Sequence, residues 1–335
     1  MASQPRYVAV VCDLDGVVYR GAEALPGAVE SLNGLTVPVI YATNNASRAP
    51  EDVAEHLRGL GLPVQPSDVV TSSQAGGAEV ARRFPAGSSV LTVGGAGVAV
   101  AVEAAGLRSR PDAREPVVAV VQGYGPEVTA ADLGEAAYAI EAGALWVATN
   151  TDLTLPTDRG VAPGNGSLVG AVANACGHGP DVVVGKPYPP LYLMCAERLG
   201  VGPDRILAVG DRLDTDIAGA HAAQMDSLFV LTGVNTLVDA ALAPANQRPT
   251  YAADDLRALG ETLHRAVEDD GWWVCGEDRR RVVDGTWEVL RSGSRTDQLT
   301  NTLYAAAGLG QDGFGDRHAE TVAALVAQVT GGSVG

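Results

Sequence analysis

The sequence predicts an α/β protein whose core is a doubly wound parallel sheet. Short apolar runs of β-forming residues recur along the chain without polar alternation, which is typical of parallel strands buried on both faces. Segments of helical character separate these runs, as βαβ units require. Polar and acidic residues gather directly after several of the runs. Open α/β sheets bind their ligands at the carboxyl ends of their strands, so these residues are the candidates for a functional site.

The first predicted strand lies in YVAVVCDLDGVVY, residues 7–19. Asp13 falls where this strand ends, Asp15 follows, and Gly16 allows a sharp turn. Two carboxylates one residue apart repel each other unless they share a proton or a cation. Carboxylate oxygens are ligands that Mg²⁺ prefers, so the pair favours a magnesium site. The alternative interpretation is two solvated loop acids after a core strand.

A second strand is expected over residues 37–42, and it ends in the polar sequence TNNAS. Capping of the following helix, residues 50–60, explains one or two of these side chains. Three consecutive polar residues exceed what a cap requires. A hydroxyl, amides and free backbone N–H groups near a helix N-terminus suit a phosphate group. Thr43, Asn44 and Asn45 are therefore candidate phosphate ligands.

The middle of the chain repeats the alternation of strands and helices, which predicts a second βα unit inserted into the first. The expected elements are a helix from residue 72, a strand, turn and helix within 88–107, a strand at 117–121, a helix at 130–142 and a strand at 144–148. The glycines of 94–97 do not make a dinucleotide site, because the third glycine of the fingerprint is absent and the next strand ends in Gln122. Residues 150–167 are polar and too long for a simple connector, so we expect a functional loop that closes over a substrate.

Another short strand, residues 182–185, leads to Lys186. Pro187 keeps this lysine out of a helix and breaks the P-loop pattern, so a nucleotide kinase is not supported. A surface lysine is the alternative to a functional one. After a helix at 190–199, the apolar strand at 206–209 ends in GDRLDTD.

The acids of that motif are Asp211, Asp214 and Asp216. Capping of the helix expected at 217–223 accounts for Asp214 or Asp216 but not for all three. Which of those two is the second functional acid stays open.

The sequence predicts the structure of the last part of the chain less clearly. A strand at 229–231 and a helix over 251–259 complete the first unit. From about residue 261 three of the four tryptophans lie in one short interval, and helices are expected at 296–307 and 319–329. We interpret this tail as a small α+β extension with its own apolar cluster.

Composition excludes several classes of protein. Hydrophobic residues make up 46% and charged residues 19% of the 335, an ordinary globular balance for one or two domains. No apolar stretch approaches the roughly 18 residues that span a bilayer, and the first residues lack an apolar signal region, so a cytoplasmic location is expected. The 4 cysteines are scattered and predict neither a zinc site nor a disulfide framework. A net charge of −17 argues against nucleic-acid binding.

Four ordered motifs now stand in the sequence: DLDGV (13–17), TNNAS (43–47), GKP (185–187) and GDRLDTD (210–216). With these motifs, residues 7–260 resemble the haloacid dehalogenase superfamily of phosphatases. The insertion resembles the type C2 cap of the NagD-like, p-nitrophenyl phosphatase branch. Within that branch, the chain is similar to the actinobacterial glycerol-3-phosphate and phosphoglycolate phosphatases. The resemblance implies a core of 1–74 and 182–260, a cap of 75–181, and an extension of 261–335 outside the resemblance.

The resemblance also implies roles for the motif residues. Asp13 is the nucleophile, and Asp15 is the general acid and base. The Mg²⁺ ligands are Asp13, Asp211 and the backbone carbonyl of Asp15, with Asp216 as an orienting acid behind the metal. The phosphoryl group is held by Thr43, Asn44, Asn45 and Lys186. The implied function is Mg²⁺-dependent hydrolysis of a small phosphate monoester through an aspartyl-phosphate. The implied partners are a small phosphorylated metabolite and, through the cap, a second copy of the chain, with no nucleic acid or membrane.

The substrate follows less directly. The polar side chains of the 150–167 loop are mostly small, namely Asp152, Thr154, Thr157, Asp158 and Arg159. No aromatic residue among them stacks on a ring, which favours glycerol 3-phosphate or phosphoglycolate. The alternatives are a phosphatase for pyridoxal phosphate or nucleotide monophosphates, a phosphomutase of the same superfamily, a phosphoacceptor signalling domain, and a catalytically silent scaffold.

Overall fold

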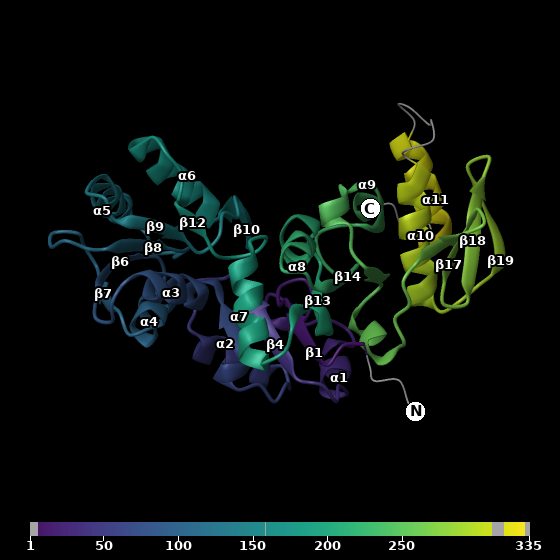
Figure 1. Cartoon of the computed structure of the whole chain (residues 1–335), viewed down its shortest axis with the longest axis horizontal. Helices are drawn as coiled ribbons and strands as arrows, with labels where there is room; N and C mark the ends of the chain where they lie inside the picture. Colours follow the sequence, from purple (N-terminus) through teal and green to yellow (C-terminus); the bar gives the residue numbers. More distant parts are fainter. Residues whose placement is uncertain (1–5, 158, 310–317, 332–335) are drawn as a thin grey trace. The chain divides into compact units, whose positions relative to one another are not determined.

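The computed structural model describes residues 6–157, 159–309 and 318–331 (Figure 1). The chain forms two compact units, one of Met1–Pro38 with Pro203–Gly335 and the other of Val39–Gly202. The domain boundaries predicted from the sequence divide the chain differently and stay a prediction. No helix within the described ranges is long and apolar enough to cross a membrane.

The first unit contains a parallel sheet whose strands run in the order β15-β14-β13-β1. These strands are β1 (Ala9–Cys12), β13 (Ile206–Gly210), β14 (Asp226–Val230) and β15 (Tyr251–Ala253). The register joins Cys12 to Val209, so β1 and β13 end side by side. Both strands are fully buried, as expected from their unbroken apolar sequences.

Short helices and turns complete this unit. They are the β2–β3 hairpin (Tyr19–Arg20 and Glu23–Ala24), α1 (Ala28–Asn33), a π-helical turn (Leu213–Ile217), α8 (Ala218–Ala222), α9 (Leu237–Leu242), and 3-10 turns at Pro203–Arg205, Ala245–Gln247 and Leu256–Gly260. The helix predicted over 251–259 is wrong. Its first three residues form β15, since they are buried and pair in parallel with β14, and nine residues are too few to separate a helical period from a buried strand.

The tail contains both a sheet and helices, as predicted. Its strands are β16 (Val267–Asp269), β17 (Trp272–Cys275), β18 (Asp278–Val283) and β19 (Thr286–Arg291), all antiparallel, and its helices are α10 (Arg295–Gly308) and α11 (His318–Thr330). Figure 1 shows α10 and α11 at the yellow end of the chain beside this sheet.

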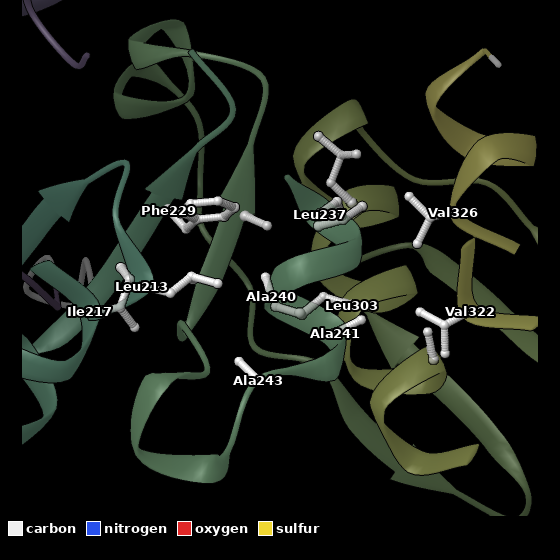
Figure 2. Close-up of a cluster of buried hydrophobic side chains, with 13 residues drawn as sticks. Leu213, Ile217, Phe229, Leu237, Ala240, Ala241, Ala243, Leu303, Val322 and Val326 are labelled. Carbon is white, nitrogen blue, oxygen red and sulfur yellow. The ribbon is translucent and has the colours of Figure 1, made fainter. Parts of the chain in front are cut away.

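The two tail helices share a hydrophobic core with the parallel sheet's own elements (Figure 2). Leu303 of α10 and Val322 of α11 are fully buried in one cluster with Leu237 of α9 and Phe229 of β14. The expectation that the tail has an apolar cluster of its own therefore needs correction for its helices. Sequence periodicity marks the apolar face of a helix but not the element that this face covers.

The second unit holds a parallel pair, β4 (Val39–Thr43) and β5 (Val69–Thr71), and a separate five-stranded sheet of order β12-β9-β8-β6-β7. The latter strands are β6 (Ser89–Val93), β7 (Arg108–Arg110), β8 (Ala119–Gln122), β9 (Leu145–Ala148) and β12 (Val182–Val183), all paired in parallel. The helices are α2 (Pro50–Gly59), α3 (Ser72–Arg83), α4 (Ala96–Ala104), α5 (Ala130–Glu141), α6 (Asn165–Cys176) and α7 (Pro189–Leu199), with a 3-10 turn at Pro66–Asp68.

The long segment 150–167 is more ordered than a plain loop. It forms a β-hairpin of β10 (Thr154–Thr157) and β11 (Gly160–Pro163), followed by the first turn of α6. Leu153 and Val161 are 68% and 77% exposed. Asp158, which the sequence placed in the substrate loop, lies outside the described residues.

Candidate active site

Three carboxylates meet at the carboxyl edge of the first unit's sheet. Because β1 and β13 are adjacent and parallel, Asp13 and Asp211 follow neighbouring strand ends. One carboxylate oxygen from each of Asp13, Asp211 and Asp216 lies within 4.8 Å of the others. Asp211 and Asp216 are only 1% and 2% exposed, so their mutual repulsion is poorly screened by water. This donor set fits a hard divalent cation that takes oxygen ligands, such as Mg²⁺.

Asp216 is held in this cluster by the turn that precedes it. The backbone N–H of Arg212 donates a hydrogen bond to Asp216 Oδ2 at 3.1 Å. Gly210 is required beside it, because a Cβ there would collide with the Asp216 side chain. Asp214, in contrast, is exposed and pairs with the Arg212 guanidinium at 3.0 Å. Of the two acids between which the sequence could not decide, Asp216 is the one in the cluster.

The loop after β14 holds Asp211 in place. The Val234 N–H donates to Asp211 Oδ2 at 2.8 Å, and a Cβ on Gly233 would overlap the same carboxylate. Gly16 has a φ of +82°, and a Cβ on it would lie 2.5 Å from Asp211 Oδ2. The Thr232 hydroxyl donates to the Gly16 carbonyl at 2.6 Å. Neither Thr232 nor Gly233 is among the site residues predicted from the sequence.

Asp15 lies in the turn after β1, where its residue is exposed. It forms an isolated bridge with Tyr19 and is not one of the three clustered carboxylates. An exposed carboxyl beside a metal site is accessible to a substrate's leaving group. Its predicted roles, as general acid and as a backbone ligand, stay predictions.

The second unit contains a polar network around Lys186, which is only 3% exposed. Lys186 Nζ donates to the Ala42 carbonyl at 3.2 Å, near the end of β4. The Asn44 side chain holds the lysine backbone on both sides. Its Oδ1 accepts from Lys186 N at 2.8 Å, and its Nδ2 donates to Lys186 O at 2.9 Å.

The same Asn44 amide makes a third hydrogen bond, from Nδ2 to Asp152 Oδ2 at 3.2 Å. A primary amide has two N–H donors, and here both have acceptors in the protein. These contacts give the amide a positioning role beside Lys186, and the phosphate contact predicted for the Asn44 side chain stays a prediction. Gly185 is needed next to it, because a Cβ there would lie 2.7 Å from Asn44 Oδ1.

Thr43 and Asn45 shape the turn that leads into α2. Thr43 Oγ1 accepts from the Asn45 N–H at 3.0 Å, and Asn45 Oδ1 accepts from the N–H and hydroxyl of Ser47 at 2.9 and 2.7 Å. These local bonds occupy the N–H groups of Asn45 and Ser47 and fix the shape of the turn. Their predicted phosphate contacts remain untested.

Three supporting residues of this segment were missed from the sequence. The Ser72 hydroxyl and the Asn150 amide both donate to the Asn44 carbonyl at 2.7 Å, and the Ser73 hydroxyl donates to the Ala46 carbonyl at 2.8 Å. Ser72 and Ser73 follow β5 directly, so their position at a third strand end was a usable signal. Sequence analysis interpreted them only as the beginning of a helix.

Comparison with known proteins identifies the class. Residues 10–108 match the family described as haloacid dehalogenase-like hydrolase, and residues 183–259 match the HAD-hydrolase-like family. The chain is 46% identical over 274 residues to D-glycerol 3-phosphate phosphatase of Mycobacterium tuberculosis, covering 79% of this chain and 75% of that protein. It is 37% identical over 254 residues to the acid sugar phosphatase of Staphylococcus aureus, covering 75% and 96%. The parallel sheet and its carboxylate cluster are thus those of a phosphoric monoester hydrolase.

The chain belongs to the haloacid dehalogenase-like hydrolase family. Among solved structures, it is similar to a glycerol phosphate phosphatase from Mycobacterium tuberculosis in complex with magnesium, with 42% identity, a TM-score of 0.81 and coverage of 91% of each chain. It is also similar to p-nitrophenyl phosphatase from Archaeoglobus fulgidus, with 29% identity, a TM-score of 0.68 and coverage of 76% and 98%. Coverage of 91% requires part of the tail, so the structural likeness extends beyond residue 260, where the sequence resemblance ended.

Proposed function

We propose that this chain is a Mg²⁺-dependent phosphatase that hydrolyses glycerol 3-phosphate through a phosphorylated Asp13. The observation that carries the proposal is the cluster of three carboxylate oxygens, from Asp13, Asp211 and Asp216, within 4.8 Å of one another. The glycerol phosphate phosphatases among the related proteins support the substrate, and the magnesium complex of one of them supports the metal.

The roles follow from the positions of the acids. Asp13, Asp211 and the backbone carbonyl of Asp15 would hold Mg²⁺, with Asp216 beside them as the acid that orients the metal's remaining ligands. When bound, the metal would offset the charge of the carboxylates and of the phosphate oxygens. Asp13 attacks phosphorus, Asp15 protonates the departing alkoxide, and Asp15 then takes a proton from the water that hydrolyses the aspartyl-phosphate.

Lys186 and the turn that begins at Thr43 would supply the positive charge and the hydrogen-bond donors for the phosphoryl group. Lys186 carries the ammonium, and Asn44 fixes its backbone through the two hydrogen bonds described above. The turn that begins at Thr43 would supply hydrogen bonds that orient the phosphoryl group. This division assigns charge neutralisation to Lys186 and orientation to the turn.

A panel of phosphate esters tests the substrate. Release of inorganic phosphate is measured for glycerol 3-phosphate, phosphoglycolate, pyridoxal phosphate and nucleoside monophosphates with the full chain and Mg²⁺. We expect the highest kcat/KM for glycerol 3-phosphate. A preference for pyridoxal phosphate or the nucleotides would overturn the substrate proposal and leave the phosphatase mechanism in place.

The same assay separates the other chemistries. A phosphomutase would convert a sugar phosphate into its isomer with little free phosphate, and a phosphoacceptor domain would stop after a single turnover. Multiple turnovers of phosphate release exclude both, and the absence of turnover in the presence of Mg²⁺ would overturn the proposal. A cytoplasmic location and a homodimer formed through residues 75–181 stay predictions, the second open to light scattering of the purified chain.

A further inference from the structure

A cavity of about 610 Å³ lies in the first unit, away from the acidic cluster. It is bordered by Asp226, the first residue of β14, and by Thr250, which directly precedes β15. The clustered acids Asp13 and Asp211 instead follow the carboxyl ends of β1 and β13. Because these strands are parallel, the cavity occupies the opposite edge of the same sheet.

The charge in this cavity is opposite to that of the chain as a whole. Arg248 and Arg265 line it, and Asp226 is the single acid among its lining residues. Asp226 is already engaged, since it pairs with Arg265, with Arg6 at 2.8 Å and with the Tyr7 hydroxyl at 2.6 Å. Within a chain of net charge −17, this leaves a local excess of guanidinium charge.

Arg248 supplies that excess. Its Nη2 donates to the Ala243 carbonyl at 3.0 Å, and no ion pair of Arg248 is found among the described residues. Its Nε is shielded from solvent and has no hydrogen-bond acceptor in the part of the chain that the structure describes. The Arg248 guanidinium therefore lines the cavity without an acidic partner among the described residues, and its charge is available to an anion there.

Neutral donors stand beside the arginine. The backbone N–H of Thr250 donates to Ser227 Oγ and the N–H of Ser227 donates to Thr250 Oγ1, both at 3.1 Å. These reciprocal bonds fix both hydroxyl oxygens as acceptors. The Thr250 hydroxyl donates its proton to Asp226 Oδ1 at 3.5 Å, so the Ser227 hydroxyl is the neutral donor that can turn to a third group. His221 completes the polar lining. A guanidinium next to hydroxyl and imidazole groups is a donor set that suits phosphate.

We propose that this cavity, lined by His221, Ser227, Arg248, Thr250 and Arg265, is a second anion site that binds a phosphate group. The volume exceeds that of a single phosphate ion, so the site has room for inorganic phosphate or for a short phosphate monoester. Either ligand is chemically related to the reaction, since one is its product and the other resembles its substrate. Occupancy would join β14 and β15 to the tail, because Arg265 and Tyr304 of the tail line the same cavity.

Isothermal titration of the full chain without metal tests the site. The background substitution Asp13→Asn removes the nucleophile, and the titrants are inorganic phosphate and glycerol 3-phosphate. Arg248→Gln removes the charge, Arg248→Lys keeps it, and Arg114→Gln is the matched control, because the Arg114 side chain is 86% exposed and belongs to the other unit. We expect one binding event that weakens at least about 10-fold in Arg248→Gln, less in Arg248→Lys, and not at all in Arg114→Gln, as for loss of a charge-assisted hydrogen bond.

Binding that is equal in Arg248→Gln and the parent protein, or no binding in the parent, overturns the proposal. Tighter binding of one titrant identifies the natural source of the phosphate group. Phosphate release by Arg248→Gln in the wild-type background, measured with Mg²⁺ and no added phosphate, separates this site from the proposed reaction. We expect Arg248→Gln to release phosphate at the wild-type rate. If the wild-type protein itself showed no turnover, the proposed phosphatase reaction would be overturned and the proposed second site would not.

Discussion

Replacing Asn44 best tests how the second unit positions Lys186 and its positive charge. Asn44→Ala removes both hydrogen bonds to the Lys186 backbone and the third one to Asp152. Lys186 is only 3% exposed, so its N–H and carbonyl would lose partners that water replaces poorly. Each group costs about 1–3 kcal/mol when left unsatisfied, and partial entry of water gives an expected loss of about 2–4 kcal/mol in the free energy of unfolding.

The effect on the reaction is expected to be separable from the effect on stability. Loss of a group that orients a functional side chain typically lowers activity about 10- to 100-fold, and we expect kcat/KM for phosphate release to fall in that range. Steady-state kinetics are measured well below the melting temperature, so that the rate refers to folded protein. Urea denaturation followed by circular dichroism gives the free energy of unfolding.

Asn301→Ala is the matched control for this substitution. Asn301 is buried, and its Nδ2 donates to the Trp273 carbonyl at 2.9 Å and to Asp278 Oδ2 at 2.7 Å, in the tail. We expect a similar loss of stability with kcat/KM within about twofold of wild type. Wild-type turnover in Asn44→Ala, or an equal loss of turnover in the control, would refute the positioning role.

Four further outcomes are expected. Asp13→Asn should lower phosphate release by several orders of magnitude with an unchanged thermal melting curve, and a loss of folding would instead make Asp13 a structural residue. Chelation should abolish turnover and added Mg²⁺ should restore it, so activity that survives exhaustive chelation contradicts the metal assignment. Leu303→Ala should cost about 2–5 kcal/mol in urea denaturation, because Leu303 is fully buried between the tail and α9, and a cost below about 1 kcal/mol would contradict that packing. Burial alone would raise the pKa of Asp226, but hydrogen bonds from Tyr7 and Arg265 hold this pKa below its ordinary value. Asp226→Asn should therefore lower the free energy of unfolding at pH 7. The difference in free energy of unfolding between this variant and wild type should shrink as the pH falls below about 4.

Local sequence was sufficient for much of the fold. The strand that precedes Asp13, the helix at Pro50–Gly59 and the helix at Pro189–Leu199 lie where apolar runs, prolines and polar strand ends predicted them. Such elements are set by neighbouring residues, and their patterns are strong. β15 was predicted as a helix because its three residues show their strand character only when they pair with β14.

The sequence predicted which residue types form the site, but not which hydrogen-bond partners each of them has. Asp13 and Asp211 could be expected to meet, because the resemblance implied that both bind the metal, whereas the pairing of β1 with β13 that joins them is visible only in the structure. The engagement of both Asn44 donors by protein acceptors could not, since it depends on Asp152, 108 positions further along the chain. The contribution of Gly233 beside Asp211 was hidden for the same reason. Long-range contacts of this kind leave no periodic trace in one sequence.

The cluster shared by α9, α10 and α11 makes the two tail helices integral to the enzyme and not an optional addition. A chain ended near residue 260 would expose Phe229 and Leu237 to water. A shortened catalytic version of this protein would need a redesigned α9 surface, because removal of the tail would leave an exposed apolar surface prone to aggregation.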